Sequence, residues 1–141
     1  MRRRIFDLES NLKVVPDYKI DRVFVVTRKI RWLPQLGVGI FVHSALLLKT
    51  CQGLFILEYS NRGRGTVVLS KMLDYGMADG EFVHQGQIWH VANHGEDVIR
   101  HITVADAKQI MVDYSSQRNY AFTKWNCHMM QMETRKQMGL Y

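Results

Sequence analysis

The stretch GVGIFVHSALLL, residues 37–48, decides the fold of this chain. Apart from His43 and Ser44 it is almost continuously apolar, which is typical of a segment buried on both faces. A strand and a buried helix both fit this pattern, and we interpret it as a strand. A turn at residues 51–53 follows, and LFILEY, residues 54–59, predicts an antiparallel strand that returns beside the first.

Further strands and two helices are predicted around this hairpin. Expected strands are residues 23–27, 66–69 and 81–92, with a turn at 61–65, a helical turn over 70–80 and a polar loop at 93–97. Residues 103–106 have the form of a capping box and predict a helix that continues through Tyr114. The last helix is expected to begin near Asn126 and to stop around Gly139. The order predicts an α+β fold, an antiparallel β-sheet with C-terminal helices.

Length and composition indicate one globular domain. The chain has 141 residues, of which 47% are hydrophobic and 23% charged, close to ordinary globular usage. We expect an N-terminal arm over residues 1–20 and a single domain over residues 21–141. Two cysteines are too few for a disulfide-stapled secreted scaffold, so a reducing compartment is expected.

The sequence argues against secretion and membrane insertion. Three arginines at positions 2–4 begin like a signal peptide, but Asp7 and Glu9 stand where an apolar core should run. The longest apolar run, Leu36–Leu48, is shorter than the roughly 20 residues that span a bilayer. We therefore expect a soluble, cytoplasmic protein, located in the host-cell cytoplasm if the source is a virus.

Cys127 is the candidate nucleophile. It lies in YAFTKWNCH, residues 120–128, where an extended aromatic segment meets the predicted start of the last helix. Unpaired N–H groups and the macrodipole at a helix N-terminus favour thiolate over thiol, and the same N–H groups can stabilise an oxyanion. The alternative is a small, unreactive core cysteine.

His43 and Glu58 are the candidate base and orienting group. His43 lies in the apolar stretch, where it is either a core histidine satisfied by a backbone group or a neutral base for a nearby thiol. Glu58 lies on the returning strand, and a carboxylate facing His43 would fix its tautomer and stabilise the imidazolium. Alternation allows an outward-facing Glu58 equally well, because strand register decides and the sequence does not give it.

Together these motifs resemble the circularly permuted papain-like thiol enzymes. A glycine-rich approach leads to HSALL at 43–47, a hairpin returns to a polar position, and NCH at 126–128 stands at a helix start. The superfamily includes lecithin retinol acyltransferase-like (H-box/NC) proteins, PPPDE deSUMOylase-like peptidases and NlpC-type peptidoglycan endopeptidases. The resemblance covers roughly residues 22–69 and 114–140, whereas residues 75–105 match nothing in it.

The resemblance implies a permuted papain-like (NlpC/LRAT-like) fold and assigns roles to three residues. His43 corresponds to the H-box histidine, Glu58 to the third polar residue and Cys127 to the cysteine of the NC motif. It implies an acyl-enzyme on Cys127 and neither cofactor nor metal. Tyr120 and Trp125 are candidates for a second oxyanion donor by proximity, and core packing is their alternative role. Family members often carry a hydrophobic or aromatic residue directly after Asn-Cys, whereas here a histidine follows.

Several functions are compatible with these motifs. The first is a cysteine peptidase or isopeptidase acting on a protein or peptide. The second, which is related to it, is a lipid acyltransferase or phospholipase of the H-box/NC type. The third is a non-catalytic viral or effector interaction protein that keeps the fold without turnover. The oligomeric state is left open.

Two further patterns suggest other functions, which we do not expect. The histidines at positions 84, 90, 94 and 101 fit no familiar closed zinc ligand set, so an exposed His-rich hairpin is expected there. The formal charge of +6 and the basic clusters at 2–4, 28–31 and 62–64, with Phe24, Trp32 and Tyr59 nearby as stacking platforms, would suit a nucleic-acid binder. A solvated face explains these clusters as well.

Overall fold

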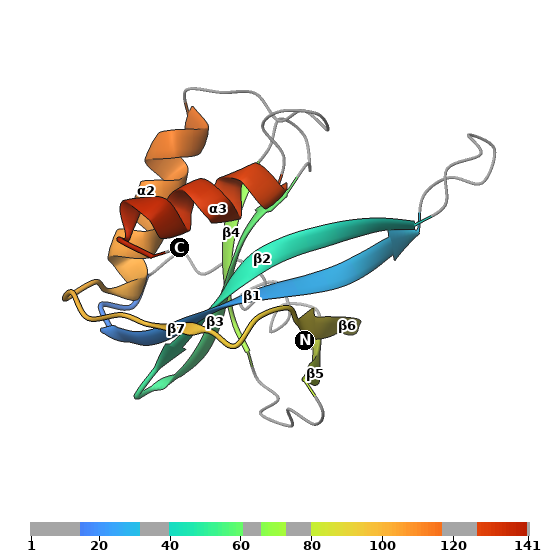
Figure 1. Cartoon of the computed structure of the whole chain (residues 1–141), viewed down its shortest axis with the longest axis horizontal. Helices are drawn as coiled ribbons and strands as arrows, with labels where there is room; N and C mark the ends of the chain where they lie inside the picture. The colour runs from blue at the N-terminus through green and yellow to red at the C-terminus, as the bar shows by residue number, and fades with distance from the viewer. Residues whose placement is uncertain (1–14, 32–39, 61–65, 73–79, 117–126, 141) are drawn as a thin grey trace, which may run out of the picture.

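The central strand of the fold, β2 (Ile40–Thr50), is the segment that the apolar pattern picked out. The structure is a computed structural model and describes residues 15–31, 40–60, 66–72, 80–116 and 127–140. In these residues the chain forms a curled antiparallel sheet followed by two helices, so the predicted α+β class is confirmed (Figure 1).

The sheet has seven strands in the order β4-β3-β2-β1-β6-β5, with β7 paired to β1. The remaining elements are β1 (Ile20–Arg31), β3 (Gly53–Ser60), β4 (Thr66–Lys71), β5 (Glu81–His84), β6 (Gln87–Val91), β7 (Glu96–Asp97), α2 (Val104–Ser116) and α3 (Cys127–Gln137). The turn at 51–52 joins β2 to β3 as predicted, and the turn at 61–65 lies outside the described residues.

Both faces of β2 are covered at Leu46–Leu48, which explains the continuous apolar sequence there. Leu46 and Leu48 point to one face and pack with residues of α2 and α3, including Met111 and Met130. Leu47 points to the other face, into a second cluster that the β5–β6 hairpin closes. Leu46, Leu47 and Leu48 are all 0% exposed. We call these sides of the sheet the helix face and the hairpin face.

The sheet forks in the middle of β2. The register between β2 and β3 runs from Thr50↔Gly53 to Leu46↔Leu57 and stops there. Beyond that point β2 continues with β1 as far as Ile40, while β3 continues with β4 as far as Ser60. The two strand pairs therefore diverge, as Figure 1 shows, and the residues just past Leu46 and Leu57 flank the opening.

Three local predictions need correction. Residues 81–92 form two strands rather than one, because Gln85 and Gly86 both adopt positive φ and turn the chain back as a hairpin. Ser70 and Lys71 belong to β4 rather than to a helical turn, and residues 73–79 lie outside the described residues. Glu96 and Asp97 form a short strand within the predicted polar loop, because they pair with Val23 and Arg22 of β1.

The start of α2 and the end of α3 form as the sequence predicts. The Thr103 N–H donates to Asp106 Oδ2 (2.9 Å) and the Asp106 N–H donates to Thr103 Oγ1 (3.1 Å), which is a complete capping box. Gly139 follows α3 with φ of 82°, the left-handed conformation that commonly ends a helix. Neither described helix combines the length and apolar character needed to cross a membrane.

The end of the predicted arm that the structure describes contacts the sheet and α2. Val15 packs against the cluster on the helix face, and Lys19 forms an isolated bridge with Thr103. The Val104 N–H donates to the Tyr18 carbonyl. Residues 1–14 lie outside the described residues.

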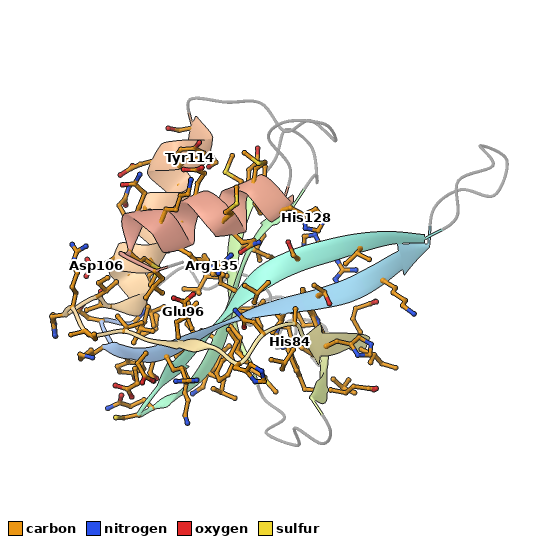
Figure 2. All side chains as sticks on the ribbon, viewed as in Figure 1. His84, Glu96, Asp106, Tyr114, His128 and Arg135 are labelled. Carbon is orange, nitrogen blue, oxygen red and sulfur yellow. The ribbon has the colours of Figure 1, made fainter. Side chains whose placement is uncertain are left out.

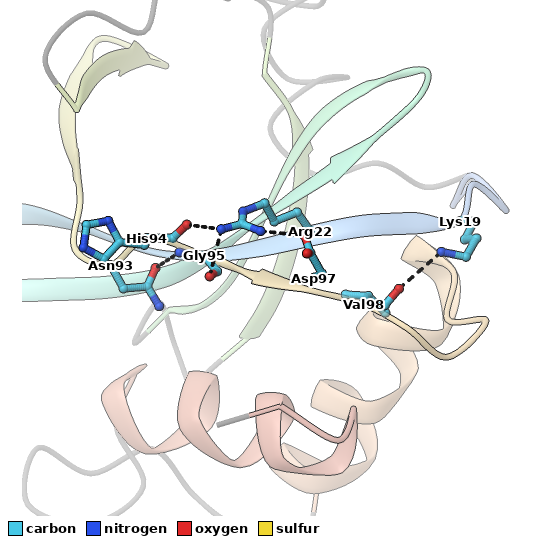
Figure 3. A network of polar contacts seen from close by, with 7 residues as sticks. All are labelled: Lys19, Arg22, Asn93, His94, Gly95, Asp97 and Val98. Atoms are coloured by element: carbon cyan, nitrogen blue, oxygen red, sulfur yellow. Dashed lines mark hydrogen bonds and ion pairs between the residues drawn. The ribbon is translucent and has the colours of Figure 1, made fainter.

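The loop between β6 and β7 is fixed to β1 by one arginine. Arg22 donates to the carbonyls of His94 and Gly95 and pairs with the Asp97 carboxylate (Figure 3). Gly95 has φ of +80°, and a Cβ there would lie 2.6 Å from the Phe24 ring. Both its conformation and its close packing therefore require glycine.

We predict that Gly95→Ala destabilises the protein much more than Gly86→Ala. Gly86 has a similar φ of +73°, but no described atom lies within 4 Å of its added Cβ. The left-handed conformation alone should cost about 1–2 kcal/mol in Gly86→Ala, and the clash with Phe24 should bring the loss in Gly95→Ala to about 2–5 kcal/mol. Urea unfolding measures both, and equal losses would contradict this account of the loop.

Candidate functional site

His43 and Glu58 meet across the opening of the fork. His43 lies on β2, three residues before Leu46, and Glu58 lies on β3, directly after Leu57, so both stand just beyond the last pair that joins these two strands. His43 Nε2 and Glu58 Oε1 are 2.9 Å apart, and the two residues are 5% and 8% exposed. Strand alternation places both side chains on the hairpin face, so the outward-facing alternative for Glu58 does not occur.

Cys127 reaches the same point from the other side of the sheet. It is the first residue of α3, and the N-terminal end of α3 lies over β2, where Figure 2 labels His128. The Cys127 side chain is 5% exposed, and hydrogen bonding to the His43 side chain lowers the pKa of its thiol. Since Nε2 of His43 faces Glu58, its Nδ1 is the nitrogen left for Cys127.

The structure thus brings together the three residues that sequence reasoning had placed in one site. They come from β2, β3 and α3, and 68 residues of sequence lie between Glu58 and Cys127. The fork explains how this is possible. Where β2 and β3 separate, α3 can present its first residue to a side chain on the far face of β2.

His43 and Glu58 each stabilise the charged form of the other. Burial disfavours the His43 imidazolium, but hydrogen bonds from Cys127 and Glu58, together with their negative charges, raise the pKa of His43 above its ordinary value. Burial likewise opposes ionisation of Glu58. The hydrogen bond and charge of His43, and more distantly the charge of Arg28, hold the pKa of Glu58 below its ordinary value.

The same contacts activate the thiol. Burial opposes a thiolate at Cys127, but the hydrogen bond and charge of His43 outweigh it and lower the pKa of Cys127. Hydrogen bonds from the backbone and the side chain of Ser44 act in the same direction. A thiolate at the first residue of a helix also lies where the helix dipole favours negative charge. These observations favour a reactive cysteine over an inert core cysteine.

Trp89 covers the histidine, and sequence reasoning missed it. Its ring meets that of His43 edge to face, with centroids 5.8 Å apart, and stacks on Phe82. The Arg28 guanidinium lies 5.4 Å from the Trp89 ring centroid. The prediction of a single strand over residues 81–92 could not show this contact. The hairpin turn pairs Phe82 with Trp89 and places both rings toward the sheet.

His84 corrects the prediction of an exposed His-rich hairpin. It is 5% exposed, and its Nε2 lies 2.8 Å from Ser70 Oγ on β4. Burial lowers the pKa of His84, and the negative charge of Glu58 opposes this shift in part. The Ser70–His84 bond fixes the β5–β6 hairpin over the fork. The histidines at 90, 94 and 101 are exposed, and the described residues hold no group of side chains that could bind a metal ion.

Some predicted residues lie outside the described part of the chain. These are Tyr120 and Trp125, the candidates for a second oxyanion donor, Trp32, one of the suggested stacking platforms, and the basic clusters at 2–4 and 62–64. Of the suggested stacking platforms, Tyr59 is buried at 1% exposure and Phe24 packs against the cluster on the hairpin face. Arg28 packs on Trp89 beside the candidate site.

Comparisons with protein-family models, with curated proteins and with solved structures found no match for this chain. The candidate site is therefore judged on its geometry and chemistry.

We predict that Glu58→Gln lowers the free energy of unfolding most between pH 4.5 and 6.5. The raised pKa of His43 contributes stability that is complete below its ordinary value of 6.5 and is lost as pH rises through the folded value. The lowered pKa of Glu58 contributes stability that is complete above its ordinary value of 4.5 and is lost as pH falls through the folded value. Both contributions are complete in the window between these values.

Urea unfolding across pH measures this effect. In the window, Glu58→Gln should lose about 2–3 kcal/mol, as expected for a buried hydrogen bond between charged groups. The matched control is Glu133→Gln, which removes a surface pair with Lys136 and should cost at most about 0.5 kcal/mol. If the free energy of unfolding that Glu58→Gln loses is constant with pH, His43 and Glu58 do not form an ion pair.

Proposed function

We propose that this protein is a cysteine hydrolase of the peptidase or isopeptidase type, with a permuted papain-like fold. The observation that carries the proposal is the convergence of Cys127, His43 and Glu58 from three separate elements, with the histidine between thiol and carboxylate. A nucleophile, a base and an orienting group in this order is the arrangement that acyl transfer by a thiol requires.

The chemistry follows from the contacts. His43 takes the Cys127 proton, and the thiolate attacks the carbonyl carbon of an amide. The charge that develops on the carbonyl oxygen can be stabilised by N–H groups at the start of α3. The imidazolium, stabilised by Glu58, then protonates the leaving amine as the C–N bond breaks. Water, deprotonated by His43, attacks the resulting thioester and releases the acid and the free thiol.

The permuted chain order also supports the proposal. His43 and Glu58 lie on the two strands of one hairpin, and Cys127 begins the last described helix, as in the H-box/NC and related families that the sequence resembles. A lipid ester would react with the same three residues. Acyl transfer from lipid but not from peptide substrates would therefore assign the H-box/NC acyltransferase activity instead.

We predict that Cys127 is alkylated by iodoacetamide well below the pH at which an ordinary thiol reacts, about 8.5. Cys51 is an internal control, because it is exposed and lies in the β2–β3 turn. At pH 6, the labelling of Cys127 should exceed that of Cys51, and His43→Ala should slow it by about tenfold or more, because a hydrogen bond to a charged group is lost. Peptide mass spectrometry follows each cysteine separately. Equal labelling of both cysteines with the same pH dependence would remove the basis of the proposal.

We also predict an acyl-enzyme. Incubation with p-nitrophenyl acetate should place an acetyl group on Cys127, detected by mass, with burst release of nitrophenol. His43→Ala should slow acylation about 10²–10⁴-fold, the usual contribution of a general base. Cys127→Ala should abolish it and Cys51→Ala should leave it unchanged. A thiol that is reactive but never acylated would indicate the non-catalytic interaction protein.

A further inference from the structure

A second histidine lies beside the nucleophile. His128 follows Cys127 on α3 and is exposed, and its Nδ1 lies 2.7 Å from Ser44 Oγ. Ser44 is 2% exposed and follows His43 on β2. Because neighbouring residues of a strand point to opposite faces, His43 and Ser44 flank the β2 backbone from two sides, and Cys127 contacts both.

The Ser44 hydroxyl has two neighbours but a single proton. It lies 2.7 Å from His128 Nδ1, and hydrogen bonding from its side chain lowers the pKa of Cys127, but it can donate to only one of these two residues at a time. A thiolate is an acceptor and cannot donate. When Cys127 is ionised, Ser44 therefore donates to the sulfur and must accept a hydrogen bond from Nδ1–H of His128. When the sulfur is acylated, the hydroxyl is free to turn toward His128.

We propose that Ser44 and His128 are positioning residues for the Cys127 thiolate. Ser44 donates a hydrogen bond to the sulfur, and His128 fixes the direction in which the Ser44 hydroxyl donates. Neither residue reacts. This inference rests on the proposed function, since it concerns the same nucleophile, and it adds a contact on the helix face that His43 and Glu58 cannot make. The charged and titratable groups around Cys127 in the described residues are then His43 from β2 and His128 from α3, while Glu58 of β3 and Arg28 of β1 act through His43.

The test is the alkylation rate of Cys127 across pH in the full chain, with iodoacetamide as the probe. At pH 6, Ser44→Ala should slow alkylation about tenfold, the value of one hydrogen bond to a charged group, and His128→Phe about threefold or more. His128→Asn, which can keep an N–H near the position of Nδ1, should stay within about twofold of the unmodified protein. Near pH 10 all variants should react equally, because every thiol is then ionised.

Ser115→Ala is the control, since it removes a serine hydroxyl on α2 that donates to the Val112 carbonyl and takes no part in the candidate site. Its alkylation rate should change by less than about twofold. Urea unfolding of each variant identifies any that is not folded.

The outcomes separate the two proposals. If Cys127 of the unmodified protein reacts like an ordinary thiol, the proposed function fails. If it reacts at low pH and Ser44→Ala and His128→Phe react equally fast, the function stands and the positioning role is wrong. Equal slowing at every pH would also overturn it, because that result indicates a structural defect rather than the loss of a contact to the thiolate.

Discussion

In the described residues, the hydrogen bond between His43 and Glu58 spans the opening where β2 and β3 separate. Backbone hydrogen bonds hold β2 and β3 together only as far as Leu46 and Leu57, and beyond them the strands separate. A side-chain bond of 2.9 Å then spans the fork in place of the backbone ladder. Two buried ionisable groups are costly unless they are paired, so the geometry of the fork and the chemistry of the pair depend on each other.

Different elements contact the candidate site on the two faces of the sheet. On the hairpin face, Trp89 covers His43, and the Ser70–His84 bond fastens the hairpin to β4. On the helix face, α3 brings Cys127 to the edge of β2 and contacts Ser44 through His128. Burial disfavours the His43 imidazolium, and the hydrogen bonds and negative charges of Cys127 and Glu58 outweigh that cost and raise the pKa of His43. The site is thus part of the core rather than an addition to its surface.

Sequence patterns predicted the elements that carry their own signals. Residues 40–48 of the apolar run, the turn that begins at Cys51, the capping box at Thr103 and the glycine after α3 each act locally, and the structure contains each of them. The candidate residues Cys127, His43 and Glu58 also come together. Strand alternation did not decide which face of the sheet Glu58 occupies, because a shift of one residue in the strand register would have placed it on the helix face.

The partners of the site were beyond the reach of sequence patterns. No pattern in residues 81–92 predicts the contact between Trp89 and His43. That contact joins two strands across the sheet, and it depends on the turn at Gln85 and Gly86. His84 looked like one of several exposed histidines and is buried against Ser70. The contact between Ser44 and His128 spans 84 residues, and it exists because α3 crosses β2 at this point.

The central claim is that Cys127 is ionised by its neighbours, and the ultraviolet absorbance of the thiolate measures this directly. In a Cys51→Ser variant Cys127 is the one cysteine left in the sequence. The account predicts a thiolate that persists well below the ordinary thiol pKa of about 8.5 and returns to that range when His43→Ala is added. A Cys127 that titrates at or above this value with His43 in place would contradict it.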